Sequence, residues 1–347
     1  MIIMAKKNTP AFNYNLEVKK LKESGPDRLY LLFGEEDYLR ERFIDEIKII
    51  CSADDSGFNC KRLDGPAINM NELSEAVDSV PFFADRSYVE VRGFDINKCK
   101  DNDCEKFKTV IADIPEYCTL VIIINPGYEM DGRLAAVKAV KKYANLIEFT
   151  EQSQDALIKW IANRFSACGK SISRSDAEYL SFVSGTLMNR LIPEIEKISS
   201  YVKGTTVSRG DIDAAAHRIP EADIFEMVDH LSKGNIDAAA RLLSDLMANK
   251  DNSPIYILAV FSQQIRKIYA YKLGQSRGMG RSALMELCNM RFDFQFNKLS
   301  LQAKNYSLSS AAKLVELCTE YDFLMKSGGN NEELMVDLLL KVAVAEK

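Results

Sequence analysis

The first part of the chain alternates short apolar runs with stretches in which apolar residues recur every three or four positions. The first apolar run, residues 28–33, is typical of a buried strand and ends at Gly34. A helix is predicted directly after it, because apolar residues from Tyr38 to Ile50 follow helical spacing. The acidic residues 35–37 would lie at the positive end of that helix.

This alternation continues to about residue 150. Further strands are predicted at residues 61–63, 87–92, 119–124 and 146–149, and further helices at residues 72–79, 105–111 and 133–143. Strands separated by helices form parallel sheets with helices on their faces. We therefore predict an α/β domain over residues 27–150, preceded by an N-terminal extension of residues 1–26.

Beyond residue 150 the strand patterns stop, and helical patterns with short loops follow to the end. A further boundary is predicted near Pro220, because proline restricts the residue before it and a new helical pattern opens at Ile224. We expect a small helical domain over residues 151–219 and a larger one over residues 220–347. An α/β domain followed by a small helical lid is the order of an AAA+ ATPase.

In that fold the turn after the first strand is the place of a phosphate-binding loop. Here it contains Gly34, Glu35, Glu36 and Asp37. A working loop reads G-x-x-x-x-G-K-[ST]: glycines let backbone N–H groups surround the phosphates, lysine neutralises them and the hydroxyl holds magnesium. The carboxylates would repel a triphosphate, or would serve only as a charge-matched helix start. Both interpretations exclude phosphate binding.

The strand at residues 119–124 provides a second test. In an active ATPase such a strand ends in acidic residues that position magnesium and the attacking water, whereas Asn125 and Pro126 follow it here. The predicted fold class is therefore an AAA+-like α/β domain, a P-loop NTPase-type parallel sheet without a functional P-loop, followed by two all-α domains. We expect no catalytic site and no cofactor.

Composition and charge narrow the class of protein further. Of 347 residues, 47% are hydrophobic and 27% charged, and no apolar run approaches the roughly 18 residues that span a bilayer. The first residues lack the order of a secretory signal, so we expect a cytoplasmic protein without membrane association. A formal net charge of −5 argues against a protein that coats nucleic acid by itself.

The sequence contains few residues that could bind a metal ion or act as a catalytic nucleophile. The eight cysteines are scattered, so reduced thiols are expected. The closest pair, Cys99 and Cys104, lacks the C-x-x-C spacing of a zinc site, and the only histidines are His217 and His230. Without a G-x-S-x-G motif, a Ser-His or Cys-His enzyme is not expected.

Several short segments of the sequence resemble, in the same order, segments of a known protein family. They are residues 29–39, where a strand runs into Gly-Glu-Glu and a helix, and residues 81–86, 157–161, 193–201, 224–229 and 321–328. In order and spacing they resemble the delta subunit family of the bacterial DNA polymerase III clamp loader, over residues from about 28 to 340. One departure is Phe82, where the family pattern has an aliphatic residue.

The resemblance implies a non-catalytic component of the DNA polymerase III holoenzyme that acts in DNA replication. Residues 27–150 would bind the beta sliding clamp and open it for loading on primed DNA, and residues 220–347 would form an oligomerising collar. The other implied partners are the gamma/tau motor subunits and the delta-prime subunit. Two further classes stay open: a nucleotide-dependent enzyme with a non-standard phosphate loop, and a helical adaptor unrelated to replication.

Phe82 and Phe83 are the predicted clamp-binding residues. They come between a helical pattern and the strand at residues 87–92, so they lie on a connection that can present them to a partner. Two adjacent rings entering an apolar pocket would suit a binding hot spot. In the alternative interpretation, both rings fasten the helix to the sheet.

A basic stretch lies between residues 261 and 304, with eight basic and two acidic residues and several interleaved aromatic residues. A possible DNA-facing or partner-facing patch consists of Arg266, Lys267, Lys272, Arg277 and Arg281. Alternatively, these residues form a solvated face over a core that contains the aromatic rings.

Overall fold

The computed structural model describes residues 13–53, 59–65, 68–99, 101–290 and 292–344. The chain divides into two compact units, an N-terminal unit of residues 1–153 with 187–189 and a C-terminal unit of residues 154–186 with 190–347. The first unit ends close to the boundary predicted near residue 150. The predicted division between lid and collar at residue 219 stays a prediction.

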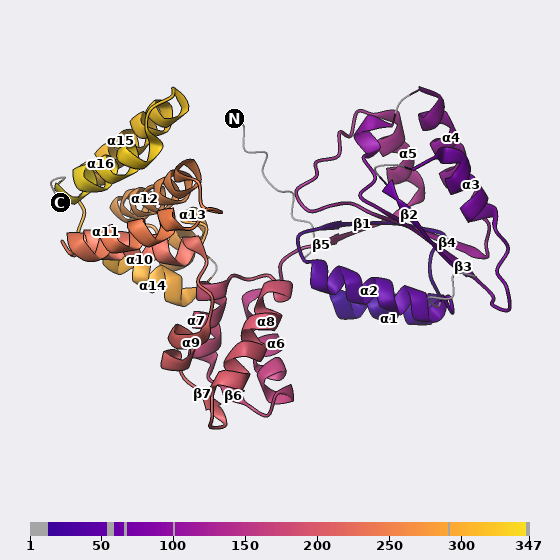
Figure 1. The fold of residues 1–347 in the computed structure, drawn as a ribbon, viewed down its shortest axis with the longest axis horizontal. Helices are drawn as coiled ribbons and strands as arrows, with labels where there is room; N and C mark the ends of the chain where they lie inside the picture. Colours follow the sequence, from indigo (N-terminus) through magenta and orange to yellow (C-terminus); the bar gives the residue numbers. More distant parts are fainter. Residues whose placement is uncertain (1–12, 54–58, 66–67, 100, 291, 345–347) are drawn as a thin grey trace. The chain divides into compact units, whose positions relative to one another are not determined.

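The N-terminal unit is built on a five-stranded parallel sheet. Its strands are β1 (Leu29–Gly34), β2 (Cys60–Asp64), β3 (Ser87–Arg92), β4 (Cys118–Ile123) and β5 (Asn145–Phe149). Their order is β2-β3-β4-β1-β5 (Figure 1), and all neighbouring pairs are parallel. The five predicted strands are confirmed, with small shifts at their ends.

Helices cover both faces of this sheet. They are α1 (Tyr14–Ser24), α2 (Asp37–Ile50), α3 (Met70–Asp78), α4 (Asp101–Ala112) and α5 (Ala135–Tyr143). α1 and α2 lie on one face, and α3, α4 and α5 lie on the other (Figure 1). Since successive strand residues point to opposite faces, Leu29 and Leu31 join the core on the side of α3–α5. Tyr30 instead contacts Phe43 of α2, with ring centroids 5.9 Å apart.

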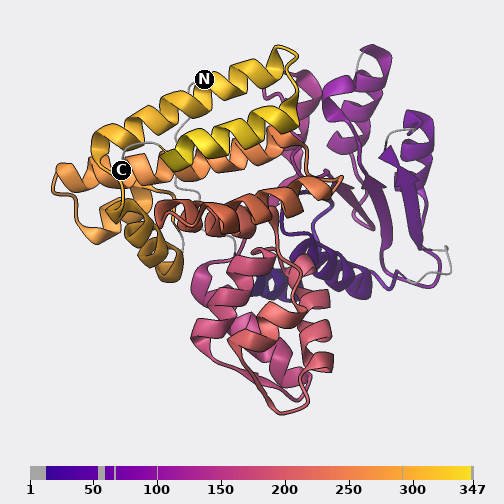
Figure 2. The ribbon, with the colours of Figure 1, turned by 60° about the vertical axis from the view of Figure 1, so that its left-hand side comes forward.

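The C-terminal unit is almost wholly helical. Its helices are α6 (Gln154–Ala167), α7 (Arg174–Ser184), α8 (Met188–Tyr201), α9 (Arg209–Ala215), α10 (Pro220–Ser232), α11 (Ile236–Ala248), α12 (Pro254–Ser276), α13 (Arg281–Leu287), α14 (Asp293–Lys304), α15 (Leu308–Lys326) and α16 (Asn331–Val344). The first residues of α8 cluster with the N-terminal unit. Helices α12, α15 and α16 pack side by side (Figure 2), and they share one apolar core with α10 and α11.

Two short strands depart from the expectation that strands end near residue 150. β6 (Ser171–Ile172) and β7 (Thr206–Val207) form a two-stranded parallel sheet inside the C-terminal unit. The expectation was wrong for these residues because two-residue strands are too short to show an alternating pattern in the sequence.

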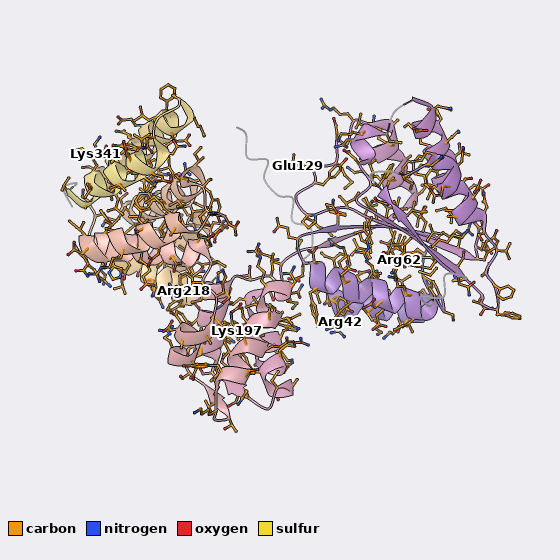
Figure 3. The ribbon with its side chains drawn as sticks, in the orientation of Figure 1. Arg42, Arg62, Glu129, Lys197, Arg218 and Lys341 are labelled. Carbon is orange, nitrogen blue, oxygen red and sulfur yellow. The ribbon has the colours of Figure 1, made fainter. Side chains whose placement is uncertain are left out.

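Cations stacked on aromatic rings join the early and late helices of the C-terminal unit. Arg209 of α9 lies 3.9 Å from the ring centroid of Tyr179 in α7 and 5.2 Å from that of Phe294 in α14. Arg218, labelled in Figure 3, adds an ion pair of 2.6 Å to Asp223 of α10. The residues before and after position 219 are therefore bonded to each other within one compact unit.

The predicted fold class is confirmed: an AAA+-like parallel sheet with helices on both faces is followed by helical domains. The predicted N-terminal extension includes α1, which packs on α2, while its residues 1–12 lie outside the described residues. Within the described ranges, no helix is long and apolar enough to cross a membrane.

Candidate functional site

The turn between β1 and α2 occupies the place of a phosphate loop. β1 ends at Gly34 and α2 begins at Asp37, so Glu35 and Glu36 alone connect them. The N–H of Glu36 donates to the carbonyl oxygen of Phe149 in β5 at 2.9 Å. Gly34 has a φ of +113°, and a Cβ added to it would lie 2.4 Å from the same oxygen. The backbone of β5 therefore closes this turn.

Glu36 is the buried carboxylate of the turn. Its side chain is inaccessible to solvent, and one of its oxygens accepts the backbone N–H of Met188 at 3.2 Å. Burial raises the pKa of Glu36 from an ordinary value of 4.5 to about 7, against the lowering effect of the N–H groups of Met188 and Tyr38. The carboxylate thus points into the protein, where a phosphate loop would leave space for a ligand.

Arg40 fixes the same turn from the first turns of α2. Its side chain is almost fully buried, and Nη1 donates to the carbonyl oxygen of Gly34 at 3.2 Å. Nη2 forms an ion pair of 2.5 Å with Asp37. This cation is therefore bound by groups of the protein itself, close to the place where the lysine of a phosphate loop would act.

The carboxyl ends of the neighbouring strands lie along the same edge as this turn. Asn125 and Pro126 follow β4, which pairs with both β1 and β3. Sequence reasoning missed Asp95, which follows β3 and is marked only by the Gly93 turn before it. The hydroxyl of Tyr128 donates to Asp95 at 2.5 Å. That bond, and an ion pair with Lys98, hold the pKa of Asp95 below its ordinary value.

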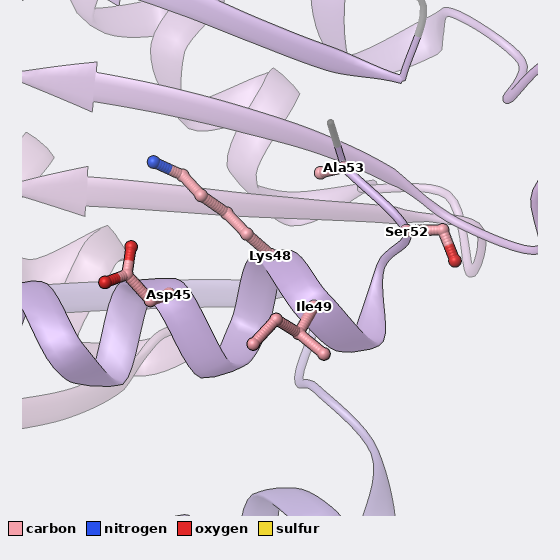
Figure 4. A pocket seen from close by; sticks show the side chains of 5 residues that line it. All are labelled: Asp45, Lys48, Ile49, Ser52 and Ala53. Carbon is pink, nitrogen blue, oxygen red and sulfur yellow. The ribbon is translucent and has the colours of Figure 1, made fainter. Parts of the chain in front are cut away.

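A buried charge network lies on the α2 side of β3. Glu90, 1% exposed, accepts the hydroxyl of Tyr88 at 2.6 Å and forms ion pairs with Lys48 at 2.9 Å and Arg92 at 2.5 Å. Lys48 also lines a pocket at the last turn of α2, next to the exposed side chain of Ile49 (Figure 4). Arg92 also pairs with both oxygens of Glu41 at 2.8 Å. Since Glu90 and Glu41 together balance the two cations, we assign this network to internal charge pairing at the sheet rather than to ligand binding.

Phe82 and Phe83 lie on the connection between α3 and β3, residues 79–86, which we call the Phe82–Phe83 loop. Phe82 is 56% exposed and Phe83 is 94% exposed. Their ring centroids are 4.3 Å apart in an edge-to-face arrangement. These exposures do not fit the alternative in which both rings fasten the helix to the sheet. A role in binding the clamp stays a prediction.

Asn59, directly before β2, holds this loop through its side-chain amide. Its Oδ1 accepts the N–H of Phe82 at 2.6 Å, and its Nδ2 donates to the carbonyl oxygen of Phe82 at 2.8 Å. Sequence reasoning did not identify Asn59, because a single polar residue before a strand carries no pattern of its own.

The basic residues of the predicted patch lie on two consecutive helices. They are Arg266, Lys267, Lys272 and Arg277, on or directly after α12, and Arg281 at the start of α13. Burial lowers the pKa of Lys267, and Arg281 forms an ion pair of 2.7 Å with Asp293 while lying over the ring of Phe296. Phe292 and Phe296 are buried, which fits a solvated face over an aromatic core. A contact of this patch with DNA stays a prediction.

The part of the chain that is described contains neither a disulfide nor a candidate metal site. The eight cysteines are free thiols, and no group of three His, Cys, Asp or Glu side chains is placed there to hold a metal ion.

Comparisons with known proteins agree on one family. A family profile described as "DNA polymerase III, delta subunit" matches residues 30–150, and one described as "DNA polymerase III delta subunit, C-terminal domain" matches residues 221–342. The DNA polymerase III subunit delta of Bacillus subtilis is 23% identical over 330 residues, which cover 93% of this chain and 94% of that protein. The probable DNA polymerase III subunit delta of Aquifex aeolicus is 21% identical over 288 residues, with 81% and 79% covered.

A solved structure shares the fold. The DNA clamp loader delta protein of Bacillus subtilis matches with a TM-score of 0.53 and 21% identity, and the match covers 94% of this chain and 99% of that one. The two family profiles together span more than half of the chain. The first covers the predicted AAA+-like domain, and the second covers most of the predicted collar domain. This chain therefore belongs to the family of bacterial DNA polymerase III delta subunits, the delta subunits of the clamp loader.

Proposed function

We propose that this delta subunit binds the sliding clamp through Phe82 and Phe83 and opens it mechanically. The observation that carries this proposal is the presence of two adjacent rings, 56% and 94% exposed, on a connection of the AAA+-like domain. Transfer of a phenylalanine ring out of water is favourable by about 25 cal/mol per Å² of apolar surface buried. A pocket of the clamp that takes up both rings would therefore supply much of the binding free energy.

Replacement of both rings tests the proposal. We expect the double variant Phe82→Ala, Phe83→Ala to bind the clamp about 30- to 1,000-fold more weakly, or roughly 2 to 4 kcal/mol. Thermal unfolding should hardly change, because little of Phe83 is buried. Surface plasmon resonance on immobilised clamp, beside a thermal melt, separates the two effects. Tyr143→Ala, which removes an exposed ring of α5, is the matched control and should bind normally.

Two results would contradict the assignment. Unchanged clamp affinity in the double variant would remove the rings from the interface. A melting temperature lower by many degrees would place them in the folded core instead, since truncation of a buried Phe costs roughly 3 to 5 kcal/mol of stability.

We also propose that the chain neither binds nor hydrolyses ATP, so that the energy for opening comes from the motor subunits. The closed two-residue turn after β1 supports this, because the carbonyl oxygen of Phe149 lies where the backbone of a phosphate loop needs room. Arg40 is bound by Gly34 and Asp37, and the buried side chain of Glu36 takes up room beside the turn.

Assembly with the motor and delta-prime subunits is proposed for residues 220–347. Helix α16 exposes 43% of Val336 and 50% of Leu340 on its surface, and such apolar surface suits a permanent subunit contact. The double variant Val336→Glu, Leu340→Glu should weaken assembly in gel filtration at an unchanged melting temperature. Normal assembly of this variant would contradict the proposal. Substitution is preferable to truncation near residue 218, because truncation would remove Phe294 from the side chain of Arg209.

The exposed cations Arg266 and Arg277 are proposed to face primed DNA inside the assembled loader. Their replacement by alanine should weaken DNA binding by the assembled loader and reduce its dependence on salt, because each lost phosphate contact releases one counterion fewer. An unchanged salt dependence of DNA binding would assign both residues to a solvated face.

A further inference from the structure

The backbone of the Phe82–Phe83 loop is held in an unusual conformation. Phe83 has a φ of +52°, in the left-handed region that residues with a bulky side chain rarely adopt. Its ring is 94% exposed, so burial of the ring in the protein does not stabilise this conformation. A contact of the neighbouring backbone must therefore keep the loop in place.

Asn59 provides such a contact. Its single amide accepts the N–H of Phe82 at 2.6 Å and donates to the carbonyl oxygen of Phe82 at 2.8 Å. Both hydrogen-bonding groups of one loop residue are thus satisfied by one side chain, as they would be by a neighbouring strand in a ladder. The Phe82 backbone cannot rotate without the loss of at least one of these bonds.

The amide is itself fixed to the sheet. The backbone carbonyl oxygen of Asn59 accepts the N–H of Tyr88 in β3 at 2.8 Å, and the next residue, Cys60, pairs with Tyr88 as β2 begins. Asn59 therefore fixes the backbone of Phe82 relative to β2 and β3. The hydrogen bonds span 23 residues of sequence, so they bring together two segments that chain connectivity leaves far apart.

We propose that Asn59 is a positioning residue of the clamp-binding element. It holds the Phe82 backbone so that both rings stand outward in their edge-to-face arrangement before the clamp arrives. A loop already in its binding conformation loses less conformational freedom on association, and the apparent affinity rises with the fraction of molecules in that conformation. This inference rests on the proposed function of Phe82 and Phe83, and it adds a residue that acts on the rings through the backbone of Phe82.

The test compares variants of the full-length chain on immobilised sliding clamp. Asn59→Ala removes both hydrogen bonds, and we expect clamp binding about 5- to 30-fold weaker at a nearly unchanged melting temperature. Asn59→Asp keeps the acceptor for the N–H of Phe82 but sets a second acceptor against its carbonyl oxygen, so its affinity should fall at least as far as that of the alanine variant. Asn71→Ala, which removes an exposed amide of α3 that accepts a hydrogen bond from Lys106 at 3.0 Å, is the matched control and should leave affinity unchanged.

A double-variant cycle separates positioning from general stability. If Asn59 acts through the rings, Asn59→Ala should cost little further affinity once both Phe82→Ala and Phe83→Ala are present. An equal loss in both backgrounds, or unchanged affinity of Asn59→Ala, would overturn the inference while a loss from Phe83→Ala alone leaves the proposed function standing. If neither the double variant Phe82→Ala, Phe83→Ala nor Asn59→Ala weakens binding, the clamp-binding site itself is wrong and the inference falls with it.

Discussion

The turn after β1 and the Phe82–Phe83 loop before β3 belong to one sheet but are opposite in character. In the turn, the carboxylate of Glu36 is fully buried and the guanidinium of Arg40 nearly so. In the loop, the ring of Phe83 is 94% exposed. Charged groups thus lie inside and an aromatic ring outside, the reverse of the usual distribution. Burial of a charge lowers stability unless the charge is paired, and an exposed ring adds none, so each arrangement calls for a reason.

The position of the two connections indicates that reason. The turn lies at the carboxyl end of its strand, the edge where open α/β sheets bind their ligands. The Phe82–Phe83 loop lies at the amino end of β3 and therefore at the opposite edge. The ligand edge is filled by Glu36, Arg40 and the β5 backbone, whereas the other edge presents the two rings. One sheet can therefore close one of its ends with buried charged groups and present exposed aromatic rings at the other.

The largest effect is expected at Gly34. An alanine there would meet the carbonyl oxygen of Phe149 at 2.4 Å, in a backbone conformation with a φ of +113° that side chains rarely adopt. We expect Gly34→Ala to lower the free energy of unfolding by about 2 to 5 kcal/mol, measured by urea denaturation. The closed turn would then be shown to depend on the absence of a side chain.

Gly132→Ala is the control for this substitution. The first atom that its Cβ would meet is the flexible tip of Lys141 at 3.4 Å, so a change within about 0.5 kcal/mol is expected. Equal stability of Gly34→Ala and the parent chain would mean that the turn has more room than its contact with β5 indicates.

A smaller effect is expected from Glu36, and it depends on pH. Burial raises the pKa of Glu36 in the folded chain to about 7, above its ordinary value of 4.5. Between these values the folded state binds more protons than the unfolded state, so Glu36 adds stability as the pH falls from about 8 to about 5. Glu36→Gln should be more stable than the parent at pH 8 by about 1 to 3 kcal/mol and lose this advantage at pH 5.

Urea denaturation of both proteins at several pH values measures this difference. Glu35→Gln, one residue away and exposed, is the matched control and should follow the parent curve. If the difference in free energy of unfolding between Glu36→Gln and the parent stayed constant from pH 5 to pH 8, the pKa of Glu36 would not be raised by burial. The turn would then not contain a buried carboxylate that costs stability, and it would differ less from the loop.

Much of this fold could be predicted because its strands carry strong patterns. The continuous apolar runs of β1 and β4 are buried along their whole length or nearly so, and such runs are characteristic of parallel sheets. The Phe82–Phe83 loop was also predictable, since Pro81 interrupts the pattern between a helix and a strand. By contrast, β6 and β7 have two residues each and leave no pattern.

The contacts that organise the two connections could not be predicted, because they join residues distant in sequence. Glu36 and Met188 are 152 positions apart, and Asn59 and Phe82 are 23 apart. Local propensity does not encode such pairs, since either partner alone is an ordinary polar or apolar residue. The acidic turn led to the prediction that phosphate is not bound there, but the burial of its second carboxylate could be seen only in the structure.

The smallest expected effect is the absence of one, and it tests the filled edge directly. If this edge bound magnesium-ATP with a Kd of about 10 µM, a concentration of about 1 mM would stabilise the chain by roughly 2.7 kcal/mol. The melting temperature would then rise by several degrees. We expect no shift relative to magnesium alone, because Arg40 is bound by Gly34 and Asp37 and the β5 backbone closes the turn. Isothermal calorimetry on the same samples should show no heat of binding. A magnesium-dependent rise in melting temperature of several degrees would mean that this edge still binds nucleotide. The turn after β1 would then be a ligand site as well, and the contrast with the Phe82–Phe83 loop would be weaker.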